Sequence, residues 1–145
     1  MKLKYETLIK EQNLSLSCPN ANCISINATA YRWVLGNNFN SDSFLPKILF
    51  DQKRNVAPRK NSQDDDFICS CCALSFFNTE DQARSRFLGI PARTRKLLGY
   101  THLAEGNIAE THGLASPVND YGHFDFFEFE GIDLGDFFKI ISDLN

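Results

Sequence analysis

Four cysteines stand in two close pairs and could bind a zinc ion. The pairs are separated internally by four and by two residues: Cys18 with Cys23, and Cys69 with Cys72. Two such pairs of thiolates can complete the tetrahedral coordination of a structural zinc site. Neither Cys23 nor Cys72 is followed by a glycine, which would ease the tight turn that holds such pairs. The alternative is that the cysteines around Cys69 are small buried hydrophobic side chains.

A histidine serving a nucleophilic cysteine is a second candidate for chemistry. The sequence offers His102, His112 and His123 as the base, and Asp125 as the residue that orients it. Such constellations are recognised by geometry rather than by sequence position, and no local signature is present here. His123 and Asp125 together with Glu128 could also hold a divalent cation. A histidine and an aspartate on the polar face of a strand are, however, more often solvated.

A cluster of cations without an acidic neighbour is the only basic patch of note. It comprises Arg84, Arg86, Arg93, Arg95 and Lys96. Residues 1–104 carry 14 Lys and Arg and 9 Asp and Glu, whereas residues 105–145 carry 9 acids and a single lysine. The patch could therefore bind an acidic protein partner, or form a solvated face whose charge balances that of the acidic C-terminal part of the same chain. With a net charge of −3, we expect neither nucleic acid nor a membrane as the partner.

The order Arg32, Ser75 and Glu128-x-Glu130 loosely resembles the Arg, Ser and Glu-x-Glu motifs of ADP-ribosyltransferases. In that family the arginine and serine position NAD, and the last glutamate stabilises an oxocarbenium-like transition state. The resemblance implies an NAD-using or nucleotide-processing enzyme that depends on Arg32, Ser75 and Glu130. The sequence departs from the family's Ser-Thr-Ser signature, because Leu74 and Phe76 flank Ser75. No glycine-rich phosphate-binding loop is present.

A second resemblance runs through most of the chain. The segments AYRW, FLP, CALSFF, HLAEGNI and GHFDFFEFEG occur in that order between residues 30 and 131. In this succession the chain resembles a group of small bacterial proteins that have no established activity. The resemblance implies a bacterial, single-domain protein and assigns no catalytic residue.

These candidates must be positioned by a sheet of alternating and fully apolar segments. We expect strands over residues 30–35, 73–77, 101–108 and 123–130. The stretch FICSCCALSFF at 67–77 is the centre of the pattern. Its second half, Ala73 to Phe77, is expected to be a strand, while its first half is either a strand or a zinc-binding turn.

Helices are predicted after that stretch. Thr79-x-x-Gln82 matches a capping box, and the spacing indicates helices between residues 80 and 98. The fold class predicted is α+β: one domain over residues 1–145, with a mostly antiparallel sheet and two or three short helices on one face. Residues 1–16 are expected to form a loosely packed arm, and residues 51–66 an exposed loop.

Two local expectations can be decided by structure. Pro46 removes a ladder donor, so any strand over residues 43–50 should be short or at an edge. The apolar residues of 122–130 change parity, so either a β-bulge near Phe126 restores one apolar face or both faces are buried.

Composition limits the function classes. Hydrophobic residues make up 43% of the chain and include 13 phenylalanines, which indicates a packed aromatic core. The first 17 residues lack the apolar run of a signal peptide or membrane span, so we expect a cytoplasmic protein with reduced thiols. The interpretation favoured by the sequence is a small cytoplasmic binding or interaction module, with structural zinc as an option and the NAD-using enzyme as the alternative.

Overall fold

The fold is organised around one six-stranded sheet. In the computed structural model, which describes residues 1–56 and 64–145, every strand pairing is antiparallel and the order is β4-β5-β2-β1-β3-β6. The strands are β1 Ala28–Val34, β2 Leu74–Phe77, β3 His102–Ile108, β4 Gly113–Ala115, β5 His123–Glu128 and β6 Phe138–Asp143. The antiparallel sheet and its four predicted strands are confirmed. β4 and β6 are additional to the four predicted strands.

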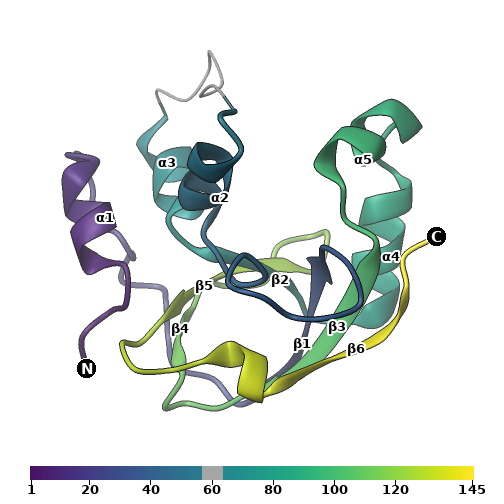
Figure 1. Ribbon diagram of the computed structural model, residues 1–145. Coiled ribbons are helices and arrows are strands. Elements are labelled where there is room, and N and C mark those ends of the chain that lie inside the picture. The colour runs from purple at the N-terminus through teal and green to yellow at the C-terminus, as the bar shows by residue number, and fades with distance from the viewer. Residues whose placement is uncertain (57–63) are drawn as a thin grey trace.

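Five α-helices and one 3₁₀ turn complete the described chain. They are α1 Glu6–Glu11, α2 Lys47–Lys53, α3 Asp65–Cys71, α4 Glu80–Leu88, α5 Ala92–Leu98 and η1 Leu134–Asp136. Figure 1 shows α2 with α3 and α4 with α5 as two separate pairs standing on one side of the sheet. The two helices predicted between 80 and 98 are confirmed, and Thr79 Oγ1 accepts a hydrogen bond from the Gln82 amide at 3.1 Å. None of the described helices is long and apolar enough to cross a membrane.

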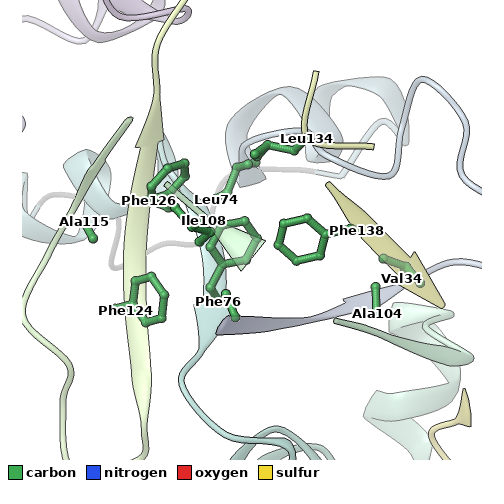
Figure 2. Packing of buried hydrophobic residues seen from close by; sticks show 11 residues of the cluster. Val34, Leu74, Phe76, Ala104, Ile108, Ala115, Phe124, Phe126, Leu134 and Phe138 are labelled. Carbon is green, nitrogen blue, oxygen red and sulfur yellow. The ribbon is translucent and has the colours of Figure 1, made fainter. Parts of the chain in front are cut away.

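The main core lies on the sheet face opposite those helix pairs. Phe76 at its centre is fully buried, and its ring centroid lies 5.4 Å from that of Phe126 and 5.3 Å from that of Phe138 (Figure 2). Burying one such side chain contributes about 1.5–3 kcal/mol. Gly106 on β3 completes the packing, because a side chain there would collide with the Phe138 ring. The aromatic core expected from composition is thus built from facing phenylalanines of β2, β5 and β6.

Strand β5 resolves the parity change without a bulge. It pairs in continuous register with β2 and with β4. Phe126 therefore packs in the main core, while Phe127 packs on the other face against Cys69 and Ala73. Of the two alternatives, burial on both faces is the one realised.

The stretch at 67–77 is divided between a helix and a strand. Its second half forms β2, as predicted, but residues 67–71 belong to α3, and Cys72 is the C-cap residue of that helix. The physical reason lies just upstream: Asp64 caps the helix by accepting from the Asp66 amide at 3.0 Å, and two more acids occupy the first turn, where the helix dipole favours them.

Three other local expectations are corrected. Pro46 is the N-cap residue of helix α2, so residues 47–50 are helical and not an edge strand. The predicted loop at 51–66 loses its first three residues to α2 and its last two to α3, and residues 57–63 lie outside the described part. The arm at 1–16 is packed: Leu8 is buried, and Lys4 N donates to Glu128 O at 2.9 Å beside β5.

Candidate functional site

The sheet opens between its two central strands. β1 and β2 pair only at Tyr31 and Phe77, and beyond this pair no further register is formed. The gap is filled by the side chain of Arg32, whose Nη1 donates to the Ser75 carbonyl of β2 at 3.1 Å. Arg32 thus takes the place of the missing backbone ladder.

Arg32 is held by carbonyl oxygens and aromatic rings. Its Nε donates to Ser43 O at 2.9 Å and its Nη2 to Leu45 O at 3.3 Å. The guanidinium carbon lies 5.7 Å from the Phe44 ring centroid and 6.0 Å from that of Phe76. Burial lowers the pKa of Arg32, yet an arginine stays charged at neutral pH. None of the described carboxylates forms an ion pair with it.

A cleft of about 290 Å³ lies at this opening. Its walls come from β1, β2 and β5, from α2 and α3, and from Leu98 at the end of α5 and Tyr100 just after it. The charged groups lining it are three cations and two carboxylates: Arg32, Lys47, Arg54, Asp51 and Asp125. Lys47 Nζ pairs with Asp51 at 2.7 Å. The cleft therefore keeps an excess of positive charge.

Ser75, His123 and Asp125 meet on the cleft side of the sheet. Side chains alternate along a strand, so the odd-numbered residues of β2 and β5 share this face. Ser75 Oγ lies 2.6 Å from His123 Nε2, and Asp125 Oδ1 accepts from Ser70 Oγ of α3 at 2.9 Å. The His123 ring packs edge-on against Phe77, with centroids 5.5 Å apart. The arrangement is a hydroxyl, an imidazole and a carboxylate in one open cleft.

Electrostatics favour a neutral imidazole next to the serine. Burial lowers the pKa of His123, and the Arg86 charge lowers it further, whereas Asp125 acts to raise it. Burial also raises the pKa of Asp125, against the hydrogen bond from Ser70 and the nearby His123. A neutral imidazole leaves a nitrogen lone pair that can accept a proton from the Ser75 hydroxyl.

The other two histidines are engaged elsewhere. His102 Nε2 lies 2.8 Å from Asp143 Oδ1, and its Nδ1 lies 2.7 Å from Thr101 Oγ1. His112 is buried, and its Nδ1 accepts from the Ala109 amide at 3.0 Å. The side-chain contact of His123 that the structure shows is with the hydroxyl of Ser75.

The cation site predicted at His123, Asp125 and Glu128 is not formed. Glu128 has the opposite parity on β5 and turns to the core face, so it lies across the sheet from the other two. Among the described residues no cluster of three or more His, Cys, Asp or Glu could hold a metal ion.

The cysteines form a disulfide in place of the predicted zinc site. Cys18 and Cys69 are joined by their sulfur atoms, which removes two of the four predicted ligands. Cys23 packs nearby. Cys72 is buried, and this burial, with a smaller effect from Cys71, raises its pKa to about 11. Disulfides are typical of oxidising compartments, so this bond is at odds with the expected reduced thiols.

The residues shared with ADP-ribosyltransferases converge only in part. Arg32 and Ser75 line the same cleft. Glu130 follows the end of β5 and is exposed, and its amide donates to Lys2 O at 2.8 Å, so it lies outside the cleft. The nearest counterpart, Glu128, is buried on the core face.

The five residues of the predicted basic patch have unequal roles. Arg84 is structural: its Nε pairs with Glu80 at 2.9 Å and its Nη1 donates to Asp143 O at 2.8 Å. Arg86 lies 4.4 Å from the Tyr121 ring centroid, and Arg95 lies over the Phe87 ring. Arg86, Arg93 and Lys96 are exposed, and of these Arg93 and Lys96 lie together on α5.

Sequence reasoning did not connect Ser75 with His123. Parity offers a partial signal: the odd positions of 73–77 and 123–130 share one face when the register pairs odd with odd residues, as it does here. The register that brings Ser75 and His123 together is a tertiary property. The contact of Ser70 with Asp125 was also not predictable, because it depends on α3, which the sequence did not predict.

Comparisons with protein families, with curated proteins and with solved structures find no significant match to this chain.

Proposed function

We propose that the protein is a binding module whose cleft over β1, β2 and β5 takes a small anionic ligand, a carboxylate or a phosphate. The observation that carries this proposal is Arg32, a buried cation that lines the cleft and has no carboxylate partner among the described residues.

The hydrogen bonds of Arg32 leave capacity for a ligand. A guanidinium has five N–H donors, and carbonyl oxygens accept from three of its nitrogens here. One N–H on each terminal nitrogen therefore remains for an oxygen of the ligand. A buried charge that lacks a counter-ion is costly, so an anion in the cleft recovers part of that cost.

The volume sets the size of the ligand. About 290 Å³ is close to the lower end of small-molecule pockets, roughly 300–1,000 Å³. Apolar rings flank the charged groups, with Phe50, Phe77 and Tyr100 in the lining. This combination favours a compact molecule with one anionic group over a polymer.

Titration with orthophosphate and with small dicarboxylates tests the proposal. In NMR spectra we expect the Arg32 side-chain Nε–H and the Ser75 amide to shift with saturation. Lys47→Gln at the mouth of the cleft should weaken binding about 3- to 10-fold, whereas Lys53→Gln on the same helix, outside the lining, should not. If no anion moves the Arg32 signal at millimolar concentration, the proposal is wrong.

A second candidate is the interaction function predicted from the basic patch, now reduced to α5. None of the described α5 side chains is buried, and Leu97 is 69% and the neighbouring Leu88 55% exposed. Arg93 and Lys96 are exposed on the same helix, which contains no acid. An acidic protein segment with apolar residues would complement this surface.

This second candidate has its own test. We expect Arg93→Glu with Lys96→Glu to abolish binding of a synthetic peptide of alternating Glu and Leu, measured by fluorescence anisotropy. Lys10→Glu, an equally exposed change on α1, is the control. Equal binding by all three proteins would contradict an α5 interface.

A further inference from the structure

We propose that Ser75 is a nucleophile for acyl transfer, with His123 as its general base, and that the cleft hydrolyses small carboxylic esters bearing a negative charge. The proposal rests on the same cleft as the proposed binding function and assigns it a reaction. It is carried by the contact of 2.6 Å between Ser75 Oγ and His123 Nε2 inside an open cavity.

The serine is both reachable and oriented. Ser75 is exposed, although its neighbours Leu74 and Phe76 are buried in the core. Its position is fixed by the β2–β5 register, in which it stands opposite Asp125. The nucleophile thus sits on a rigid strand, with its hydroxyl turned into the cleft.

The opening of the sheet also places hydrogen-bond donors near the reacting centre. Ser116 N donates to Asp125 O at 2.9 Å, so the backbone groups of Asp125 point away from β2. By the alternation of an antiparallel ladder, the amide of Ser75 opposite points away from β5, toward the gap. Arg32 Nη1 lies in that gap and donates a hydrogen bond to the Ser75 carbonyl oxygen. The Ser75 amide and the spare guanidinium donors can stabilise an oxyanion that forms at the serine.

The reaction balances without a cofactor. Ser75 Oγ attacks the ester carbonyl carbon while its proton passes to His123 Nε2. The bond from that carbon to the alcohol oxygen then breaks, and His123 returns the proton to the departing alcohol. A water molecule attacks the acyl–Ser75 ester, gives one proton to His123, and releases the carboxylic acid as Ser75 Oγ recovers that proton.

Asp125 acts through His123 and is a positioning residue. It stands two residues away on the same strand, is held by Ser70, and its charge favours the imidazolium formed in each step. The other charged groups around His123 are Arg86 from α4 and, in the lining of the cleft, Arg32 from β1, Lys47 and Asp51 from α2 and Arg54 at the C-cap of α2. Removing the Asp125 charge should therefore make the imidazolium harder to form.

Labelling with a fluorophosphonate, which phosphonylates activated serines, tests the nucleophile directly. We expect one adduct on the intact protein, mapped by mass spectrometry to Ser75. Ser75→Ala should carry none, and His123→Gln should label at least 100-fold more slowly. Ser85→Ala, which removes an exposed hydroxyl on α4, should label as the wild type does. Circular dichroism checks that each variant is folded.

Hydrolysis of p-nitrophenyl succinate gives the second readout. We expect kcat/KM to rise with pH through the pKa of His123 and then level off. Asp125→Asn should lower kcat and move the midpoint of this profile to lower pH, a shift that a merely structural role would not produce.

The outcomes separate the two proposals. A folded wild-type protein that binds orthophosphate but gains no adduct at Ser75 overturns the nucleophile and leaves the binding function standing. An adduct at Ser75 that depends on His123, in a protein that binds no free anion, supports the nucleophile and overturns the binding function.

Discussion

Glu128 makes the stability of this protein depend on pH in an unusual direction. Its side chain is 1% exposed; its Oε2 pairs with Lys4 Nζ at 3.3 Å, and its Oε1 is buried without a hydrogen-bond partner among the described residues. Burial raises its pKa from 4.5 to about 7, against the lowering effects of Lys4 and Arg32. The carboxylate is thus more costly to charge in the folded chain than in the unfolded one.

The sign follows from proton linkage. Between pH 4.5 and about 7 the folded state holds a proton that the unfolded state has lost, so the free energy of unfolding falls as pH rises through this window. Each pKa unit corresponds to about 1.4 kcal/mol, so the Glu128 contribution amounts to about 3 kcal/mol. It is fully present below pH 4.5 and lost above about pH 7.

Glu128→Gln keeps the shape of the side chain and removes its titration. We expect the variant and the wild type to differ little at pH 4.5, and the variant to be more stable by about 3 kcal/mol at pH 8. Urea unfolding followed by Trp33 fluorescence from pH 4.5 to 8.5, at constant ionic strength, measures the difference. Taking the difference cancels titrations that the two proteins share.

Glu130→Gln, on an exposed side chain two residues away, is the matched control and should give a pH-independent difference. If the Glu128→Gln difference is also flat, or if this variant is less stable than the wild type at pH 8, the reasoning fails. The second result would mean that Lys4 stabilises the carboxylate by more than burial costs it.

Two further predictions concern the core and the disulfide. Phe76→Ala should lower the free energy of unfolding, measured in urea, by about 3–5 kcal/mol, because it empties the centre of the main core. Phe137→Ala, at a side chain 44% exposed, is the control and should lower it by about 1 kcal/mol or less. Equal losses would contradict the packing. Replacing Cys18 and Cys69 by alanine should lose about 2–4 kcal/mol, since the bond closes a loop between residues 51 apart. Dithiothreitol should destabilise the wild type equally and leave this variant unchanged; a wild type insensitive to the reductant would show that the bond is absent.

The parts of the fold that were predictable are those written in local patterns. Thr79 and the acids after it specify the start of α4, and Gly99, with φ of 80°, ends α5 in the left-handed conformation that glycine adopts readily. The central strands are similarly marked by dense apolar runs. These signals act within a few residues, so a single sequence contains them in full.

The errors arose where a local signal was weak or had two meanings. The cysteine-rich half of 67–77 is apolar enough for a strand, yet the cap at Asp64 and the acids in the first turn favour the helix α3. Pro46 argues against a strand, but proline is also well suited to the start of a helix, and it is the N-cap residue of α2. The pairing of Cys18 with Cys69 depends on where α3 lies, and no spacing rule contains that information.

The sequence marks Arg32, Ser75, His123 and Asp125 one by one, but their convergence could not be predicted, because it depends on a missing interaction between β1 and β2. In a regular sheet β1 would continue to pair with β2. The Ser75 carbonyl would then be occupied by the backbone ladder, and Arg32 would lose that acceptor while remaining beside Phe44 and Phe76. Instead the strands part beyond Tyr31 and Phe77, and the guanidinium donates to the carbonyls that the open ladder and the nearby loop leave unpaired. The Arg32 side chain therefore supplies hydrogen bonds in place of the missing ladder, and it also keeps the two strands apart. Because a buried charge is costly, an arginine at a break in the central pairing, in the cleft that Ser75 and His123 also line, favours a functional role for the gap.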